Sequence, residues 1–285
     1  MASAATAIIA VGSELLTGDT ANTNATWLSQ QIRSLGHRVL WHLTVDDNEE
    51  QIQKALRLCQ DEGMAEVFVT GGLGPTTDDI TRDSVAKFLD RPLQFSEQSW
   101  HKIVELLNSR GVPIADTNKR QCYFPQGSEI LTNPVGTADG FLCQKASTRY
   151  WILPGPPKEM HSLWQAFSGG RISQADDPVL CRIWHTIGYS ESALGQLLES
   201  LALEGLDLAY QSHAPYVRVK AFYRQSDEPA LAPKLDILHD TLQQRTFFYD
   251  TQDPLALLWS RLDGKKSQIW EGFCRGYVTN RLIQV

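Results

Sequence analysis

Runs of apolar residues alternate along the first ninety positions with segments whose apolar residues recur at helical spacing. The runs predict strands at 7–11, 39–45 and 67–70, and the spaced segments predict helices at 24–35, 49–59 and 80–89. Strands that alternate with helices in this way form a parallel sheet with helices on both faces. We therefore predict an α/β fold, a three-layer and mostly parallel sheet, for the first part of the chain.

The same pattern continues with a longer helix and several short strands before a proline-rich break. We predict a helix at 97–110, strands at 129–131, 140–143 and 150–153, and a helix at 158–167. The glycines and prolines of 168–178 are typical of a linker. A first domain is therefore expected over residues 1–170.

A second, smaller group of elements follows this linker. Strands are predicted at 182–187, 208–212, 217–223 and 246–249, and helices at 191–201 and 232–242. The order β-α-β-β-α-β suits a small two-layer α+β domain, expected over residues 179–250. Residues 251–285 are predicted to form a tail, with a short helix that carries Leu255, Leu258, Trp259 and Leu262 on one face.

Composition and charge exclude some classes of binding partner for this chain. The chain has 285 residues, a formal net charge of -7 and a pI of about 5.5, so it lacks the general basic field that binds nucleic acid. Its five cysteines show no zinc spacing. No apolar run approaches the ~20 residues of a membrane span, and the N-terminus does not resemble a signal peptide. We expect a cytoplasmic protein that binds neither membrane nor nucleic acid.

The stretch VTGGLGPTTDDIT ends the third predicted strand with glycines and begins the next helix with two aspartates. Glycines allow close approach of a ligand, so the amides of Gly71, Gly72 and Gly74 are expected to face an anion at a helix start. Asp78 and Asp79 would repel that anion unless a divalent cation such as Mg²⁺ lay between. The alternative is that Asp78 caps the helix and Asp79 complements its dipole.

Polar side chains follow the first two strands as well. Ser13, Glu14, Asn22 and Asn24 come after the first strand, and Asp46, Asp47 and Asn48 after the second. Ligands of parallel sheets bind at the edge where strands end, so we expect these groups to share one site. For each asparagine taken alone, capping of the next helix is the alternative.

Three further segments carry groups suited to a ligand. Asn133-Pro134-Val135-Gly136-Thr137 and Leu153–Glu159 are rigid turns rich in backbone donors, although each is also explained as a tight connection. The segment Asn118–Gln121 includes Lys119 and Arg120, which suit a phosphate or a solvated basic face. The seven histidines show no metal-binding spacing and are interpreted as structural.

Six motifs in this order resemble the N-terminal part of the CinA (competence/damage-inducible) family. They are VGSELLTGDTANTN, VDDNEE, TGGLGPTTDDIT, NKRQ, NPVGTADGF and ILPGPPKEM, and they cover about the first 165 residues. The resemblance implies a molybdopterin-binding-like (MoCF) first domain and a KH-like second domain, although this chain has no GxxG loop. The family's C-terminal amidohydrolase motif has no counterpart after residue 250, so no nicotinamide mononucleotide deamidase activity is expected.

The resemblance further implies a metal-dependent pyrophosphatase that splits ADP-ribose, or a related dinucleotide such as FAD, into AMP and a phosphorylated product. It assigns Asp47 and Asp79 as catalytic metal ligands for Mg²⁺ or a transition metal such as Co²⁺, with K⁺ as a further cation. Water activated by the metal would attack a phosphorus. The implied substrate-binding residues are Ser13, Glu14, Asn22, Asn24, Asn48, Gly71, Gly72, Gly74, Thr76, Asp78, Thr81, Asn118, Gln121, Asn133, Gly136, Thr137, Gly155, Pro156 and Glu159.

Two alternatives stay open at this point. One is nucleotidyl transfer to molybdopterin, and the other is a non-catalytic nucleotide-binding or scaffold protein. Family domains of this type often self-associate, so a homodimer is expected. Trp259, Trp270, Phe273 and Tyr277 are candidates for its interface or for covering the core.

Overall fold

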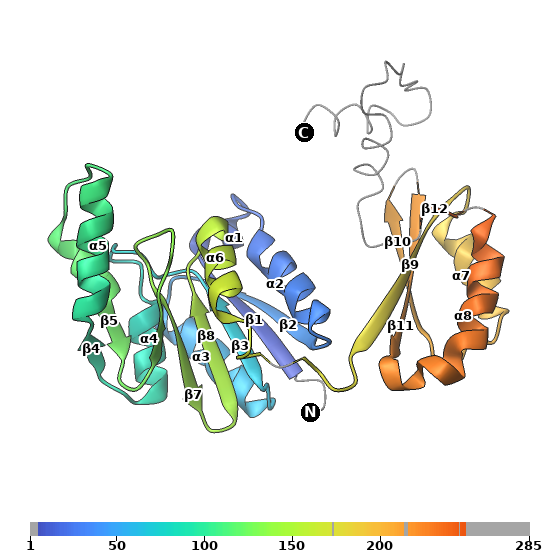
Figure 1. The fold of residues 1–285 in the computed structure, drawn as a ribbon, viewed down its shortest axis with the longest axis horizontal. Helices are drawn as coiled ribbons and strands as arrows, with labels where there is room; N and C mark the ends of the chain where they lie inside the picture. Colours follow the sequence, from blue (N-terminus) through green and yellow to red (C-terminus); the bar gives the residue numbers. More distant parts are fainter. Residues whose placement is uncertain (1–4, 173, 214–215, 245, 249–285) are drawn as a thin grey trace, which may run out of the picture. The chain divides into compact units, whose positions relative to one another are not determined.

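The structure is a computed structural model that describes residues 5–172, 174–213, 216–244 and 246–248 (Figure 1). The chain divides into two compact units, residues 1–178 and residues 179–285, which are described separately below. The predicted tail at 251–285, with its aromatic residues, lies outside the described residues.

A six-stranded sheet forms the centre of the first unit. Its strands lie in the order β2-β1-β3-β8-β7-β6. The neighbours from β2 to β8 are parallel, whereas β7 and β6 add an antiparallel edge. The strands are β1 (Ala5–Val11), β2 (Arg38–Val45), β3 (Glu66–Thr70), β6 (Glu129–Leu131), β7 (Gly140–Lys145) and β8 (Thr148–Leu153).

Helices cover both faces of this sheet, because successive residues of a buried strand point to opposite sides. Ile8 packs in a cluster with Leu28 of α2 and Leu163 of α6, whereas its neighbour Ile9 packs in a second cluster with residues of α3 and α4. The helices are α1 (Ser13–Thr17), α2 (Thr23–Ser34), α3 (Glu49–Asp61), α4 (Thr81–Leu89), α5 (Glu97–Ser109) and α6 (Pro157–Phe167). The predicted α/β fold with a mostly parallel sheet is confirmed.

Four short elements of this unit were not predicted. They are α1, the 3₁₀ helix η1 (Asp116–Cys122), and strands β4 (Leu93–Phe95) and β5 (Tyr123–Pro125). The two strands pair with each other across about thirty intervening residues of α5 and η1. Elements of three to seven residues are too short to show a period, so their hydrophobic pattern carries no signal.

The segment predicted as a linker packs against the first unit. Ile172 and Ala175 are buried, the amide of Ala175 donates to the carbonyl of Leu35, and Pro178 contacts Gly36. The first unit therefore continues to Pro178, and the division between the units falls directly after it.

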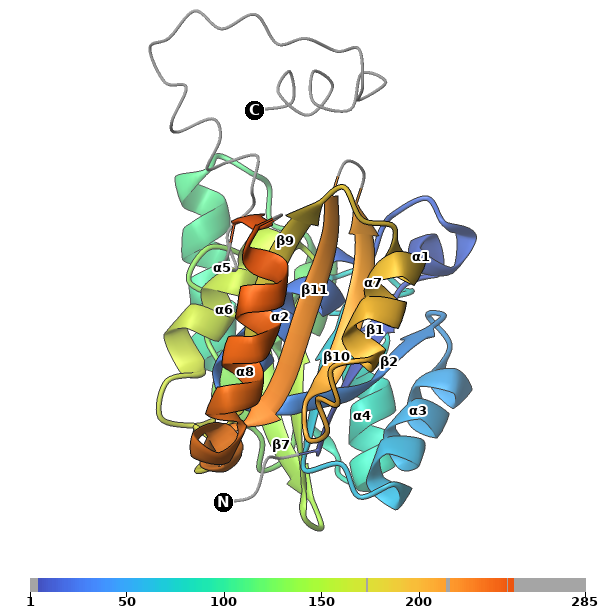
Figure 2. The ribbon, with the colours of Figure 1, turned by 90° about the vertical axis from the view of Figure 1, so that its right-hand side faces the viewer.

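The second unit is an antiparallel sheet in the order β10-β11-β9-β12. Figure 2 shows α7 and α8 lying on the same face of this sheet, where they bury a core that includes Trp184, Val219 and Leu235. The elements are β9 (Val179–Ile187), α7 (Glu191–Glu199), β10 (Asp207–His213), β11 (Tyr216–Arg224), the 3₁₀ helix η2 (Gln225–Asp227), α8 (Glu228–Gln243) and β12 (Thr246–Phe248). The predicted element order is present, but it is also the order of ferredoxin-like folds, so the likeness to a KH domain stays a prediction.

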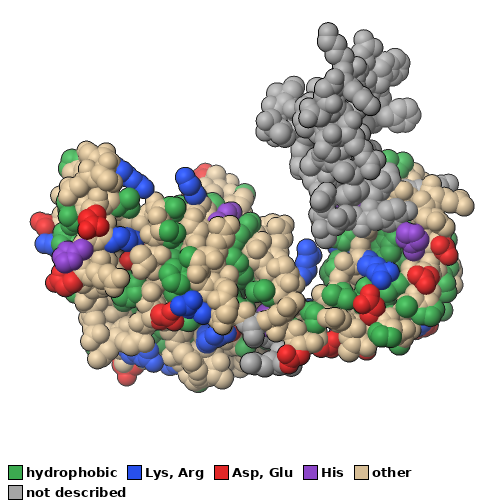
Figure 3. Space-filling view, in the orientation of Figure 1, with side chains coloured by type: hydrophobic (Ala, Val, Ile, Leu, Met, Phe, Trp, Pro, Cys, Tyr) green, Lys and Arg blue, Asp and Glu red, His purple; other side chains and the backbone are tan. Residues whose placement is uncertain are grey.

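Charged side chains of both signs are scattered over the face of the molecule drawn in Figure 3, with no single-sign field on the described residues of that face. Among the described residues, no helix is both long and apolar enough to span a membrane.

Candidate functional site

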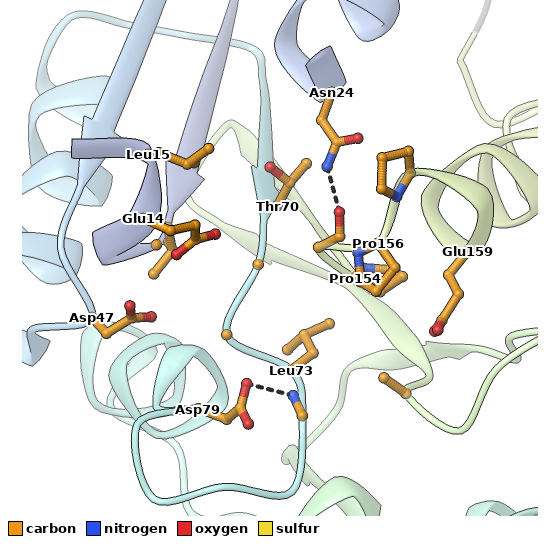
Figure 4. Close-up of a pocket in the computed structure, with 18 of the residues that line it drawn as sticks. Glu14, Leu15, Asn24, Asp47, Thr70, Leu73, Asp79, Pro154, Pro156 and Glu159 are labelled. Atoms are coloured by element: carbon orange, nitrogen blue, oxygen red, sulfur yellow. Dashed lines mark hydrogen bonds between the residues drawn. The ribbon is translucent and has the colours of Figure 1, made fainter. Parts of the chain in front are cut away.

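A pocket of about 570 Å³ opens at the carboxyl edge of the first unit's parallel strands. It lies where β1, β2, β3 and β8 end, as expected for this class of sheet. Figure 4 shows Glu14, Asp47 and Asp79 at one end and Asn24, Pro156 and Glu159 at the other. Its lining also includes Gly12, Leu15, Thr70, Gly71, Gly72, Leu73, Gly74, Asp78, Gln121, Thr137, Ala138, Pro154, Gly155 and Pro157.

The glycine loop after β3 forms the floor between these two ends. Gly71 and Gly72 have φ of 104° and 64°, a region that favours glycine. Two of the three amides predicted to face an anion are already used, however. The amide of Gly71 donates to the carbonyl of Leu153 at 3.1 Å, and that of Gly74 donates to Oδ1 of Asp79 at 2.7 Å. The loop's glycines therefore serve mainly to shape it.

Asp79 holds the loop in this shape. Its two carboxylate oxygens accept hydrogen bonds from the amides of Gly74 and Thr76, the latter at 2.9 Å, and from the Thr76 hydroxyl. Asp78 does not cap α4, since the residue at the cap position is Ile80 and no side chain bonds there. The predicted cap by Asp78 is therefore wrong, and Asp79 has a structural role in the loop that was not predicted, while metal binding by Asp79 stays a prediction.

The buried side chain of Arg82 supports the glycine loop after β3. Arg82 is 2% exposed and donates to the carbonyl of Leu73 at 2.6 Å. Burial lowers the pKa of Arg82 to about 10, and the nearby Asp79 opposes that change. The guanidinium stays charged at neutral pH, so it balances part of the acidic charge at this end of the pocket.

The three asparagines expected at the strand ends have different roles. Asn22 caps α2 by accepting from the amide of Ala25, and Asn48 caps α3 by accepting from Gln51. The capping alternative is therefore the correct reading for these two. Asn24 instead is 8% exposed and donates through Nδ2 to the carbonyl of Gly155 at 2.7 Å, which joins α2 to the loop after β8 (Figure 4).

This bond brings the N-termini of two helices to the same end of the pocket. The first turn of α2 lines it through Asn22, Thr23 and Asn24, and the first turn of α6 lines it through Pro157 and Glu159. Helix N-termini carry partial positive charge and unpaired amides. The part of this end beside Asn24 and Gly155 therefore favours an anion such as a phosphate, whereas the Glu159 carboxylate points away from Asn24 (Figure 4).

The opposite end is acidic. Oδ2 of Asp47 accepts from the amide of Ser13 at 3.0 Å, which ties the loop after β2 to the start of α1. Burial raises the pKa of Asp47 above 3.8, the Ser13 amide lowers it, and the carboxylates of Glu14, Asp46 and Asp78 raise it further. No lysine, arginine or histidine is among the described residues that line the pocket, and Arg82, which balances part of this acidic charge, is buried beneath the loop.

This crowding gives a prediction for Asp47→Asn. A carboxyl whose folded pKa is raised stabilises the fold below its ordinary pKa and loses that contribution as the pH rises through the folded value. At neutral pH the ionised Asp47 is therefore disfavoured in the folded protein. We expect Asp47→Asn, whose Oδ1 still accepts from Ser13, to melt higher than the wild type at pH 7 and to show no such gain near pH 3.5. Thermal unfolding at the two pH values measures this, and a lower melting temperature at pH 7 would contradict it.

The far wall is a loop held by one asparagine. Oδ1 of Asn133 accepts from the amides of Val135 and Gly136, while its Nδ2 donates to the carbonyl of Ala138 and to Oε2 of Glu159. Next to it, Nε2 of Gln121 donates to Oγ1 of Thr137 at 3.1 Å. The NPVGTADG motif therefore forms a rigid wall rather than a simple connection.

The structure gathers most of the predicted site residues, but not all. The pocket lining includes fourteen of them, and seven are outside it: Ser13, Asn48, Thr76, Thr81, Asn118, Asn133 and Gly136. Several of these seven support the site, as described above for Ser13, Thr76 and Asn133. Asn118 accepts from the amide of Ala115 and so begins η1. Lys119 pairs with Asp116, and Arg120 donates to the carbonyl of Thr76.

Sequence reasoning missed one group behind this wall. Asp139 is 1% exposed and forms an ion pair with Lys102 of α5, while its other oxygen accepts from Ser99 at 2.7 Å. Asp139 also accepts from the amide of Asn133 at 2.7 Å. Lys102 and Ser99 lie on an ordinary amphipathic helix, so no local signal pointed to them.

Comparisons with known proteins agree with this fold. Residues 7–174 match the family described as "Probable molybdopterin binding domain". A competence-damage inducible protein of Caldanaerobacter subterraneus is 35% identical over 195 residues, 68% of this chain and 47% of the relative. One of Caldicellulosiruptor saccharolyticus is 31% identical over 98% of this chain and 70% of its own length. The crystal structure of the CinA protein of Thermoplasma acidophilum, titled as having unknown function, superposes with a TM-score of 0.53 at 32% identity, covering 58% of this chain and 96% of that one.

The sheet, the edge pocket and the matched residues together define a domain of the molybdopterin-binding class. The chain belongs to the CinA-like family of competence-damage inducible proteins. It spans about half the length of the first of these relatives, 47%.

The predicted hydrolysis of ADP-ribose or FAD is corrected by these comparisons. The relatives are named as competence-damage inducible or CinA-like proteins with a molybdopterin-binding domain, and nothing among them supports a pyrophosphatase. The geometry gives a physical reason as well. Two of the three glycine amides predicted to hold the diphosphate are bonded within the protein, so the loop offers a diphosphate fewer donors than predicted.

Proposed function

We propose that the edge pocket binds a phosphorylated pterin of the molybdopterin class. The supporting observation is the division of one pocket into an end formed by two helix N-termini and an end formed by carboxylates. A phosphate suits the first end. A ring rich in N–H donors suits the second, because ionised carboxylates are acceptors only. A phosphorylated pterin has both groups, and the matched family is described as binding this class of compound.

The size of the pocket agrees with such a ligand. Pockets for small molecules have volumes of about 300–1,000 Å³, and this one is about 570 Å³. The proposed orientation places the phosphate toward Asn24 and Gly155 and the ring among the carboxylates that line the rest of the pocket. A diphosphate stretched across the glycine loop would instead bring its charge next to Asp47 and Asp79.

A divalent cation fits the donor set only in part. The described residues contain no group of three or more histidine, cysteine, aspartate or glutamate side chains that could hold an ion. Mg²⁺ commonly binds through one or two carboxylates together with ligand phosphates and water. We therefore restrict the predicted cation to one that Asp47 holds jointly with oxygens of a bound ligand.

The test is a titration of the protein with neopterin phosphate, a fluorescent pterin with a phosphorylated side chain. We expect saturable binding that is at least about tenfold tighter than that of unphosphorylated neopterin, because the helix N-termini stabilise the phosphate. Mg²⁺ alone should leave the melting temperature unchanged. The proposal fails if neopterin phosphate does not bind, or if it binds no better than neopterin.

A pair of variants locates the binding. Asp47→Asn removes one charge from the acidic end and should weaken the binding of neopterin phosphate, whereas Asp61→Asn makes the same change at the exposed end of α3. Equal affinities of these two variants would mean that the ligand binds elsewhere.

A further inference from the structure

Glu159 lies in the wall of the pocket, and its position is not explained by the helix that carries it. It is the third residue of α6, where a glutamate commonly bonds back to the amide of the cap residue. Here the cap residue is Pro156, which has no N–H. The side chain turns instead to Asn133, whose Nδ2 donates to Oε2 at 2.7 Å.

The neighbouring loop is shaped around this carboxylate. A Cβ atom at Gly136 would lie 2.1 Å from Oε2 of Glu159 and 2.7 Å from Oε1, so a side chain there would displace the carboxylate from this position. The side chain of Asn133 is held by its own loop, since Oδ1 accepts from the amides of Val135 and Gly136 and Nδ2 also donates to the carbonyl of Ala138, while the Asn133 amide donates to Asp139. Lys102 and Ser99 of α5 hold Asp139 in turn. A chain of contacts from α5 thus fixes Glu159 in one orientation.

Among the residues that the structure describes, the Glu159 carboxylate forms no ion pair. Lys102, which supports this wall, is paired with Asp139 and with the carbonyls of Asn133 and Gly136. Since each carboxylate oxygen has two acceptor sites, Oε2 can bond to Asn133 and still accept from a ligand, while Oε1 is left for a second donor.

We infer that Glu159 recognises the ring of the ligand by accepting two adjacent N–H groups, as offered by the 2-amino-4-oxopyrimidine edge of a pterin or a guanine. Two parallel N–H donors match the two oxygens of a carboxylate, as in bidentate pairs of arginine and carboxylate. Asn133 and Gly136 position Glu159 for this contact. The inference rests on the proposed function and adds the edge of the ring that the pocket selects.

The inference specifies which edge of the ring the pocket recognises. With the phosphate near Asn24 and Gly155, the inference places the pyrimidine edge at Glu159 and Thr137, which both line the pocket. Selection of a donor edge is therefore assigned to Glu159, the lining carboxylate that Asn133 holds.

The test compares two ligands on three proteins. The ligands are neopterin phosphate and its lumazine counterpart, in which an oxygen replaces the 2-amino group. The proteins are the wild type, Glu159→Gln and Glu97→Gln, the last of which makes the same change in the first turn of α5 at an exposed position. The wild type and Glu97→Gln should prefer the pterin by about 10- to 100-fold, the usual effect of leaving a buried charged acceptor unpaired. Glu159→Gln should lower that preference to less than about threefold.

The outcomes separate the two claims. If neopterin phosphate does not bind the wild type at all, the proposed function fails. If it binds and the wild type does not distinguish the two ligands, or if Glu159→Gln keeps the preference, the role of Glu159 is refuted while the proposed function stands. Should Glu159→Gln not fold, Glu159→Asp serves instead, because the shortened carboxylate cannot reach both donors and should also lose the preference.

Discussion

Asp79→Ala is expected to lower both the stability of the first unit and the affinity of its pocket for a ligand. The change removes the acceptor of two backbone amides, at Gly74 and Thr76, and of the Thr76 hydroxyl. Hydrogen bonds to a charged group contribute about 1.5–3 kcal/mol each. Because Asp79 is half-buried and water can replace part of the loss, we expect a decrease of about 2–3 kcal/mol in the free energy of unfolding.

Urea unfolding followed by circular dichroism measures the loss of stability, and titration with neopterin phosphate measures the loss of affinity. Asp78→Ala is the control for the urea measurement, because Asp78 is the adjacent acid in sequence and is exposed. Its urea midpoint should stay near that of the wild type. Equal midpoints for the two variants would show that the loop does not depend on Asp79.

The contrast between these two aspartates shows a limit of reading the sequence. Adjacent acids at a predicted helix start are chemically identical candidates for a cap, a dipole partner or a metal ligand. What separates them is a turn of the chain that brings the amides of Gly74 and Thr76 to one carboxylate and leaves the other in solvent. That turn depends on the path of the whole loop, which no local pattern specifies.

The asparagines illustrate the same limit over a longer distance. Asn22 and Asn48 cap helices through partners three residues away, which the sequence permits one to foresee. Asn24 lies two positions after Asn22 and bonds to Gly155, which is 131 positions away. A contact of that separation becomes visible only when β1 and β8 are placed in one sheet.

The edge itself could be predicted because it follows from topology. Strands that alternate with helices in a parallel sheet end on the same side, so the polar residues after β1, β2 and β3 had to meet. This topological argument could not find the residues that support the pocket without lining it. Lys102 and Asp139 are a buried pair between α5 and the loop after β6, and the helical pattern of α5 gives the same signal with or without that pair.

Function was harder to predict than fold for a physical reason. Amides, glycines and carboxylates at a sheet edge suit a diphosphate with a metal, and they suit a phosphorylated pterin equally well. The choice depends on which of these groups are already bonded within the protein. Gly71, Gly74 and Asp79 line the pocket as predicted, but the Gly71 and Gly74 amides and the Asp79 carboxylate also form hydrogen bonds that build the loop.

Gly71→Ala is expected to have the largest effect on stability of any change considered. Gly71 has a φ of 104°, which is unfavourable for alanine, and an added Cβ would lie 2.1 Å from the backbone carbonyl oxygen of Val11. Val11 ends β1 and Gly71 directly follows β3, so a shift of either backbone disturbs the adjacent pair Ala10–Thr70 of these two central strands. The positive φ alone costs about 1–2 kcal/mol, and with the clash we expect a loss of about 3–5 kcal/mol.

Gly63→Ala separates the clash from the conformational cost. Gly63 also has a positive φ, 69°, but an added Cβ there would meet nothing within 4 Å. This variant should lose only about 1 kcal/mol, whereas Gly71→Ala should melt roughly 10 °C lower than the wild type. Thermal unfolding of the two variants decides the matter. If the two variants have the same melting temperature, the close contact between Gly71 and the end of β1 does not account for the glycine at this position. The floor of the pocket would then be less rigid than its geometry indicates.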